Sequence, residues 1–567
     1  MRFMTGTRFT CVLYFIVLCL NAQEKYPKDA FRSPLDIPLV LSGTFGELRS
    51  NHFHSGIDIK TQQRQGLPVY AIADGTVTRI KVSLYGYGKA LYVAHPNGFT
   101  SVYAHLQKFG PNIEDHIKEV QYDKRKFEVE VFPEYGQLEV KKGDIIAYTG
   151  NTGGSFGPHL HFEIRNSVTE KPTNPLLYGF EVRDATNPEL IGLFGYPLSK
   201  DSHINQSADR VQLNFTRQSD GSFLADELTA IGTIGFGFNG FDRQDMAANK
   251  NGIYSVRQSV NGKVHTEYDF ETFSFGETRY INTLIDFCHY SKYQQRIQKV
   301  FKEPYNKLNI YNHLHLNGKL VIQEGMNYTV ELLLSDFEGN QTKVMIPVLG
   351  KKGSFKPSKT VDSTGNFLIA NKPNSFDLES AKVYFPESTF YRDFHINLKK
   401  GRDTITIHDK TVPAHRNFTL TFDVSKINPE EKKQLFIAYL NDDLKPRYSK
   451  TYKKGNTFTT RTRSLGKYTL AKDTVPPKVN PRNFKPNQWL NNYRYLSLTI
   501  SDDLSGIRSY DAYLNGEWIL MEYEPKKKTI TYNFDDKTVE QTQCDLKVVV
   551  TDNVGNTTTF EETFFRK

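Results

Sequence analysis

The sequence predicts a mainly β protein, with an N-terminal antiparallel sheet domain followed by several β-sandwich domains. The first observation is a succession of short apolar runs separated by turns that contain Gly, Asn and Asp. The second is the aromatic content: Tyr and Phe number 32 and 40, and their rings suit a pleated, half-buried surface. The third is the length of 567 residues, which accommodates about three to five domains.

The N-terminus has the pattern of a signal peptide. Arg2 and Arg8 flank the start of an apolar run at residues 9–20. That run is shorter than the roughly 20 residues needed to span a bilayer, and a short apolar run after a positive start is typical of a secretory signal. Ala22 is a small residue at a suitable cleavage position. We therefore expect residues 1–22 to be removed and the mature chain to be exported.

The chain has four cysteines, and one of them permits a second interpretation of the leader. Cys19 follows an apolar stretch, as in a lipoprotein signal, but Leu18 stands where such signals normally carry a small residue. Cys288 and Cys544 remain in the mature chain, and neither lies in a CxxC pair, which excludes a cysteine zinc site. We expect these two residues to be buried thiols rather than a disulfide framework.

Charge and hydropathy exclude some classes of protein. A mean hydropathy of −0.52 is too polar for a protein with several membrane spans. The formal charge of +9 favours solubility, or attraction to an anionic partner such as a cell wall. The sequence contains no basic helical pattern and no RNP-like strand, so we expect no nucleic-acid partner.

The chain divides into a sheet domain and three strand-rich blocks. The sheet domain is interrupted by a charged insertion at about residues 111–138, whose first half we expect to be helical. The pair Pro476 and Pro477 indicates a linker before the last block. The expected boundaries are residues 23–180 for the sheet domain, followed by 181–350, 351–474 and 475–567.

The last block has the alternation of a β-sandwich strand set, as in YLSLTISDD and DLKVVVTDN. The segment TDNVGN at residues 551–556 resembles SDFEGN at residues 335–340. We interpret this pair as a weak internal repeat at equivalent edges of two sandwiches.

Three short segments of the sheet domain contain residues suited to a metal site: NHFHSGIDI at 51–59, SVYAHL at 101–106 and GPHLHFE at 157–163. A catalytic zinc ion takes three protein ligands from His and carboxylate side chains. In the first segment, a turn at residues 55–56 would fold His54 back beside Asp58. In a strand, His159 and His161 point to the same face, because residues two apart share a face.

An isolated HxH pair is a weak signal, and the chain contains two others. The pair His313 and His315 has no neighbouring HxxxD, so we interpret it as an exposed strand face. His52 lies two residues before His54 and is interpreted as a flanking residue only.

The order and the residues of these segments resemble those of a known family. The runs HSGIDI, GLPVYAIADGTV, YAHL, VKKGDIIAYTGNTGGSFGPHLHFEI and NPLLY resemble the M23 family of zinc endopeptidases, of lysostaphin type or LytM type. The resemblance covers roughly residues 43–180. It implies a metallopeptidase domain there, and it says nothing of the C-terminal two thirds.

Carried over by position, the resemblance assigns roles to five residues. It implies that His54, Asp58 and His161 bind one Zn²⁺, and that His105 and His159 are the two active-site histidines that do not bind the metal. All five positions of the family pattern are intact in this sequence. That matters because some family members have lost ligands and act only as activators of other hydrolases.

The resemblance implies hydrolysis of peptide bonds. No HExxH motif supplies a glutamate base, so we assign the proton transfers jointly to His105 and His159. Tyr103 has two interpretations, an oxyanion donor or a packed core tyrosine. Arg49 and Asn51 lie near the site in the sequence and are candidates for binding substrate.

The substrate class that the resemblance implies is the peptide cross-link of peptidoglycan, outside the cytoplasm of a bacterium, in the periplasm or at the cell surface. Two alternatives remain: a secreted protease of glycine-rich proteins, and a non-catalytic protein that binds cell wall or activates another hydrolase. The last block is similar to bacterial immunoglobulin-like domains, and we expect the C-terminal blocks to target or position the enzyme at a surface or glycan. The insertion at 111–138 is a candidate lid over the cleft.

Overall fold

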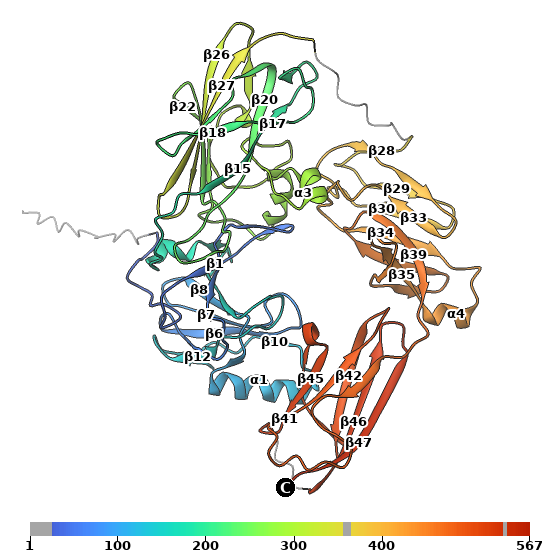
Figure 1. The fold of residues 1–567 in the computed structure, drawn as a ribbon. Coiled ribbons are helices and arrows are strands. Elements are labelled where there is room, and N and C mark those ends of the chain that lie inside the picture. Colours follow the sequence, from blue (N-terminus) through green and yellow to red (C-terminus); the bar gives the residue numbers. More distant parts are fainter. Residues whose placement is uncertain (1–24, 355–364, 537–540) are drawn as a thin grey trace, which may run out of the picture.

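The computed structural model describes residues 25–354, 365–536 and 541–567 (Figure 1). The chain is mainly β, as the sequence predicts. The signal peptide at 1–22 and the lipoprotein alternative at Cys19 lie outside the described residues. Within those residues, no helix has both the length and the apolar character needed to cross a bilayer. Figure 1 shows four β-rich bodies following one another along the chain, the last of which (red) returns to the first (blue).

The first body is built on an antiparallel sheet that brings the predicted metal segments together. Asp58 and His161 come from its two neighbouring strands β4 and β13, which pair antiparallel. The sheet order is β1 (Leu41–Gly43), β4 (Ile57–Lys60), β13 (His159–Asn166), β8 (Phe99–Ala104), β7 (Lys89–Ala94), β6 (Gly75–Val82) and β10 (Val129–Val131). A smaller sheet has the order β5 (Pro68–Tyr70), β12 (Ile145–Tyr148) and β9 (Lys108–Phe109).

Strand β13 shows why this sequence forms a strand with two different faces. Leu160, Phe162 and Ile164 are fully buried and belong to the core of the first body. The histidines at 159 and 161 alternate with them and therefore lie on the opposite face. Period-two alternation thus packs one side of the strand and leaves the other for the site.

The insertion at 111–138 is part of the first body. Its first half forms helix α1 (Pro111–Lys124), as expected, and Ile113 and Ile117 of this helix pack into the core. Its second half contributes β10. Strand β11 (Glu139–Val140) begins directly after the insertion, and both β10 and β11 pair with β6. The segment therefore completes the edge of the sheet farthest from β1.

Residues from the N-terminal part of the first body pack into the core of the second. A hairpin of β2 (Leu48–Arg49) and β3 (His52–Phe53) places Phe53 against Phe270 and Phe273, with ring centroids 5.4 and 5.3 Å apart. Phe45 belongs to the same core. The main sheet has the order β17 (Val211–Leu213), β15 (Glu189–Pro197), β20 (Leu228–Phe241), β27 (Gln341–Gly350), β26 (Asn327–Ser335), β21 (Ser255–Val260), β22 (Lys263–Asp269) and β24 (Tyr311–Leu314).

The third and fourth bodies are each formed by two antiparallel sheets around one core. The third comprises β29 (Asn374–Asp377), β30 (Ala381–Phe385), β34 (Phe418–Asp423), β38 (Thr457–Thr462) and β37 (Tyr452–Lys454), facing β32 (Leu398–Lys400), β33 (Thr404–Ile407), β39 (Gly466–Lys472), β35 (Leu435–Leu440) and β36 (Pro446–Tyr448). The fourth comprises β40 (Lys478–Pro481), β41 (Tyr495–Ser501), β45 (Thr529–Asn533) and β44 (Met521–Glu524), facing β43 (Glu517–Trp518), β42 (Ile507–Leu514), β46 (Gln543–Asp552) and β47 (Thr557–Phe565).

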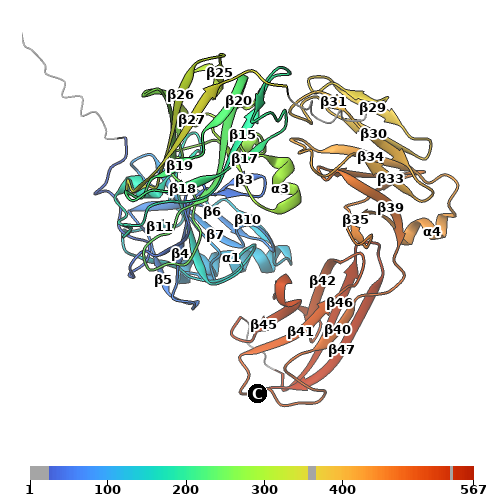
Figure 2. The ribbon, with the colours of Figure 1, turned by 45° about the horizontal axis from the view of Figure 1, so that its top comes forward.

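The fourth body contacts the first directly, so the chain closes on itself (Figure 2). Lys89 of β7 forms an ion pair with Glu522 of β44 at 3.0 Å. Lys118 of α1 pairs with Asp536. Lys526 donates to the carbonyl oxygen of Ser155 at 3.1 Å, in the loop that leads into β13. The C-terminal body therefore contacts a loop that borders the predicted site.

Both described cysteines are free thiols, which agrees with the expectation that they form no disulfide. Cys544 is buried in β46, but Cys288 is exposed in the short helix α3 (Phe287–Tyr293). The prediction of a buried thiol is wrong for Cys288, because α3 buries none of its side chains.

Candidate metal centre

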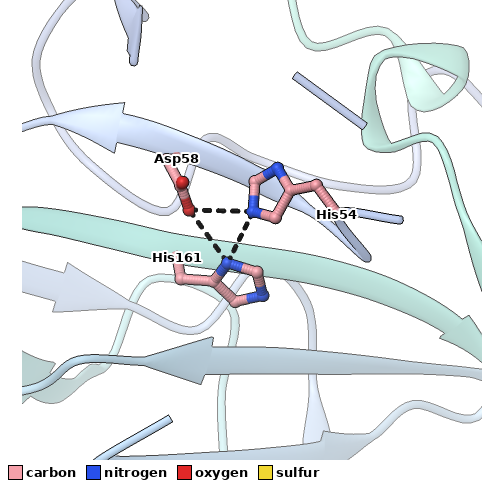
Figure 3. A group of neighbouring side chains, drawn as sticks. All are labelled: His54, Asp58 and His161. Carbon is pink, nitrogen blue, oxygen red and sulfur yellow. Dashed lines mark hydrogen bonds and ion pairs between the residues drawn. The ribbon is translucent and has the colours of Figure 1, made fainter. Parts of the chain in front are cut away.

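Three side chains converge on one point of the first body (Figure 3). Asp58 of β4 stands directly opposite His161 of β13 in the antiparallel register. His54 reaches the same point from the turn before β4. The distances are 3.0 Å between His54 Nε2 and Asp58 Oδ1, 3.0 Å between His54 Nε2 and His161 Nδ1, and 2.9 Å between His161 Nδ1 and Asp58 Oδ1.

This triangle of donor atoms fits a metal ion of the kind the sequence predicts. The donor set is two imidazole nitrogens and one carboxylate oxygen, which is suited to zinc. Bonds of about 2.0–2.1 Å in a tetrahedral site separate the ligand atoms by about 3.3 Å, so a small outward movement accommodates the ion. His54, Asp58 and His161 are 2%, 5% and 2% exposed, so water competes little for these atoms.

A second contact fixes the orientation of each ligand side chain. His54 donates from Nδ1 to the Thr44 carbonyl oxygen at 2.8 Å. His161 donates from Nε2 to Glu163 at 2.8 Å. Arg49 donates to the second carboxylate oxygen of Asp58 at 2.6 Å. Since each outer atom is engaged, one nitrogen or oxygen of each side chain is left for the centre, as in known metal sites.

The electrostatics of the centre favour one added positive charge. Burial lowers the pKa of His54 to about 4, which keeps this imidazole neutral and able to bind a metal. Burial alone would also lower the pKa of His161, but hydrogen bonds with Asp58 and Glu163 outweigh it and raise the pKa to about 9. Two buried carboxylates thus hold a positive charge at His161, and a metal ion would replace the proton there.

Glu163 is a residue that the sequence reasoning missed. It is fully buried, and besides His161 it accepts hydrogen bonds from Ser55 at 2.7 Å and from Arg165 at 2.6 Å. Tyr87 also donates to it. The signal was present in the sequence, because Glu163 lies two residues after His161 in one strand and so shares its face.

Replacing Glu163 with Gln is expected to weaken zinc binding by about 10–100-fold, because the carboxylate that orients and polarises His161 loses its charge. The measurement is a zinc titration in competition with a chromophoric chelator. The matched control is Glu170→Gln, since Glu170 also contacts Arg165, at 3.3 Å, but does not contact His161. Equal zinc affinity in Glu163→Gln and the control would contradict this role.

His105 lies beside the three ligand residues, directly after β8. Its backbone is left-handed, with φ of 58°, and its Nδ1 donates to the Thr152 carbonyl oxygen at 2.8 Å. Its ring centroid lies 4.8 Å from that of His159 and 5.8 Å from that of His161. Burial lowers the pKa of His105 to about 3, and charge on the two neighbouring histidines adds to this effect. The imidazole is therefore neutral at pH 7, with Nε2 able to accept a proton.

His159 is held in a similar way from the other side of the centre. Its Nδ1 donates to the Gly157 carbonyl oxygen at 2.9 Å. Its Nε2 lies 3.5 Å from Asp58 Oδ1, which places this nitrogen next to the triangle of donor atoms. The structure thus brings all five predicted residues into one group, with His105 and His159 adjacent to the ligand triangle.

The packed interpretation of Tyr103 is the one that the structure supports. Its side chain is fully buried in the core of the first body. Its hydroxyl accepts from the Ile72 backbone N–H at 3.2 Å and from Ser101 at 3.0 Å. The alternative of an oxyanion donor is wrong, because Tyr103 lies on β8 with its side chain on the core face, whereas His105 lies beyond the end of that strand.

Arg49 and Asn51 have structural partners. Arg49 contacts Asp58, as described above, so it orients a ligand. Asn51 Oδ1 accepts from Arg279 at 3.1 Å and from Asn282 at 3.0 Å, both in the second body. The expectation that these two residues bind substrate is replaced by roles in holding the β2–β3 hairpin and Asp58.

His52 and the pair His313 and His315 lie apart from the centre, as expected. His52 is exposed, and its Nδ1 donates to the Ser50 carbonyl oxygen at 2.8 Å. His313 is exposed on β24 of the second body.

The segment 111–138 does not lie over the centre. Its strand β10 is separated from β13 by β8, β7 and β6, and its helix packs into the core. This placement gives no support to a lid.

Deleting residues 111–138 is therefore expected to destabilise the first body rather than to raise activity on small peptides. Ile113, Ile117 and Val129 are 5%, 2% and 7% exposed, and each such side chain contributes about 1.5–3 kcal/mol. Thermal unfolding and peptidase assays test this, with Ile117→Ala and the exposed Glu119→Ala as a matched pair. A deletion variant of unchanged stability and raised activity on small peptides would restore the lid hypothesis.

Comparisons with known proteins agree with the geometry. Residues 52–122 and 131–175 match the family model "Peptidase family M23", and the interruption falls within the insertion. Residues 365–473 match the model "Zu5-like domain", which covers most of the third body.

Two curated relatives align with the first body. The DD-carboxypeptidase/endopeptidase Mpg of Neisseria meningitidis is 32% identical over 160 residues, which are 27% of this chain and 30% of the relative. The murein hydrolase activator NlpD of Salmonella dublin is 34% identical over 158 residues, which are 28% of this chain and 33% of the relative. The chain thus spans about a third of the length of these relatives.

Among solved structures, the catalytic domain of the antimicrobial peptidase lysostaphin from Staphylococcus simulans is 26% identical. The match covers 25% of this chain and 93% of that one, with a TM-score of 0.19. The family match at residues 52–175 coincides with the sheet that carries the His–Asp–His group. The N-terminal body of this chain therefore carries a match to peptidase family M23 over residues 52–122 and 131–175.

Proposed function

We propose that this chain is an exported, zinc-dependent endopeptidase that hydrolyses peptide bonds in the cross-links of peptidoglycan. One observation carries the proposal: the ligand triangle of His54, Asp58 and His161 stands beside two further histidines that are not part of it. A protein that only binds cell wall has no use for such an arrangement. A zinc-dependent hydrolase uses both a metal and groups that transfer protons.

The residues of the site divide the chemistry between them. A bound Zn²⁺ would supply a Lewis acid and a water whose pKa falls to about 7. His105, neutral and with Nδ1 committed to Thr152, is suited to accept a proton at Nε2. His159, with Nδ1 committed to Gly157, directs Nε2 to the same point and is the second group suited to proton transfer. We assign the proton transfers to the two residues jointly.

The names of the relatives and the charge of the chain support the proposed substrate class. The Neisseria relative is named a carboxypeptidase and endopeptidase, and the Salmonella relative a murein hydrolase activator. The net charge of +9 favours contact with an anionic wall. The N-terminal leader supports export, with the periplasm or the cell surface as the site of action.

The bodies after the peptidase domain are proposed to position it at its substrate. The last, for which we propose an immunoglobulin-like sandwich, donates from Lys526 to the loop that precedes His159. The proposed role is to hold this border of the site while the two middle bodies contact the wall or a glycan.

Two alternatives are kept because of specific observations. An activator without catalysis is suggested by the Salmonella relative, and a protease of glycine-rich proteins by the resemblance to lysostaphin-type enzymes. The intact group of five residues favours an enzyme over an activator.

Digestion of purified peptidoglycan, with mass analysis of the products, separates these functions. The proposal predicts new free amines at cross-links, which a chelator abolishes and added zinc restores. Cleavage of glycine-rich protein but not of wall would favour the second function. Tight sedimentation with the wall and no cleavage in the presence of zinc would contradict the proposal and favour an activator.

A further inference from the structure

Three aspartates from separate segments meet at the junction between the first and second bodies. One carboxylate oxygen of each lies within 4.8 Å of the others. Asp184 comes from the segment that joins the peptidase domain to β15, Asp242 follows β20 directly, and Asp336 follows β26 directly. The junction therefore gathers three negative charges at the ends of two strands and the linker between domains.

Two of these carboxylates are buried, and the third, on Asp184, is half-buried. Asp242 and Asp336 are 3% and 4% exposed. In the described part of the chain, none of the three aspartates forms an ion pair with Lys or Arg, and the cavity between them is lined by no basic side chain. Buried charges are normally paired or bound to a metal. Burial, together with Asp184 and Asp336, raises the pKa of Asp242 to about 7, which reflects this crowding.

A separate observation indicates that a ligand belongs in this cavity. Asn251 is 3% exposed and lines the cavity with the aspartates, yet neither its Oδ1 nor its Nδ2 has a hydrogen-bond partner. Oδ1 of Asp242 also lacks one. Buried polar atoms without partners are rare in native proteins. The cavity volume of about 30 Å³ is enough for a single ion or water.

We propose that this cavity binds one Ca²⁺ ion through the carboxylates of Asp184, Asp242 and Asp336 and the amide oxygen of Asn251. The donors are all oxygen atoms, which hard cations prefer. Ca²⁺–O distances of about 2.3–2.6 Å place opposite ligand atoms about 5 Å apart, which accommodates the 4.8 Å limit. Mg²⁺, with bonds of about 2.0–2.1 Å, needs a tighter cage.

The ion would hold a loop that supports the metal centre. The loop after Asp242 carries Gln244, whose Oε1 accepts from the Leu41 backbone N–H of β1 at 2.7 Å. At its other end, Gly252 donates to the Thr44 hydroxyl at 3.0 Å. The Thr44 carbonyl in turn accepts from His54, and β1 pairs with β4 next to Asp58. One strand thus links the calcium site to two of the three metal ligands.

The two segments of the sequence repeat, SDFEGN and TDNVGN, make the same contact in the structure, the second of them at the entrance to the last body. Asn340 donates to the Asp184 carbonyl oxygen at 3.2 Å, and Asn556 donates to the Asp473 carbonyl oxygen at 3.2 Å. In both places a DxxGN turn fastens a linker aspartate beside two others, the second set being Asp473, Asp502 and Asp552.

Calcium binding by the zinc-loaded full-length chain tests the proposal. The number of ions bound at saturating CaCl₂ is measured by equilibrium dialysis, and the thermal midpoint by calorimetry. We expect a Kd in the range of about 10⁻⁴–10⁻³ M found in extracellular modules. Asp242→Asn should bind one Ca²⁺ fewer per chain and lose a calcium-dependent rise of roughly 5 °C in the midpoint. Glu227→Gln, which alters an exposed carboxylate of the same body, should behave as the wild type.

An unchanged number of bound ions and an unchanged thermal rise in Asp242→Asn would overturn the proposal. If that variant fails to fold, Asp184→Asn on the half-buried linker gives the same comparison. Hydrogen exchange of the wild type is an independent readout: Ca²⁺ should slow exchange of the Leu41 and Gly252 amides. Unchanged exchange of both amides at saturating CaCl₂ would also count against the site. None of these readouts depends on peptidase activity.

Discussion

Replacing His161 with Ala is expected to remove zinc binding and peptidase activity together. His161 supplies one of only three donor atoms of the triangle, and its Nδ1 lies within 3.0 Å of both other donors. Its loss also leaves Glu163 and Asp58 without their histidine partner. The fall in zinc affinity should exceed the roughly 10–100-fold that loss of an outer partner causes. Chelator competition and peptidoglycan digestion measure the two effects on one preparation.

The control for this variant is His313→Ala, which alters an HxH pair that is exposed on β24. It should keep both zinc and activity. Activity that survives in a metal-free His161→Ala protein would refute the ligand assignment and the metal-dependent mechanism with it. Circular dichroism of both variants shows whether the sheet remains folded.

Replacing His105 with Ala is expected to leave zinc bound and to lower kcat by about 10²–10⁴-fold, the range for removal of a general acid or base. His105 is not among the three residues of the triangle, and its Nδ1 is engaged with the Thr152 carbonyl oxygen. Single-turnover digestion of a cross-linked peptide, with zinc content measured in parallel, tests the expectation. Because the variant lacks only a proton-transfer group, KM should change much less than kcat.

Loss of zinc in His105→Ala would show that this residue is a ligand and that the triangle is misassigned. His52→Ala serves as the comparison, since His52 is exposed and lies two residues from a ligand. It should retain both zinc and kcat. An unchanged kcat in His105→Ala would leave His159 as the sole proton-transfer residue.

Much of the metal centre is local in the sequence and could therefore be predicted. The turn that folds His54 beside Asp58 spans five residues, and the HxH pair lies in one strand whose alternation is set by Leu160 and Phe162. The glutamate that orients His161 is local too, but it belongs to no metal-ligand pattern, so the spacing of the ligands does not predict its role. The residues that could not be predicted act over long distances. For example, the sequence leaves open whether the Tyr103 side chain faces the core. That is decided only when its strand pairs with its neighbours in the sheet.

The sequence by itself determined the fold class, the five site residues and their likeness to a metallopeptidase family. These depend on period-two alternation, turn residues and short spacings, which are properties of neighbouring positions. Only the tertiary structure decided that Arg49 holds Asp58, that Cys288 is exposed and that residues 111–138 complete a sheet edge. It alone joined Asp184, Asp242 and Asp336, and brought Lys526 to the loop before His159. Such contacts join segments far apart in the chain, and their geometry follows from how the bodies pack rather than from any local pattern.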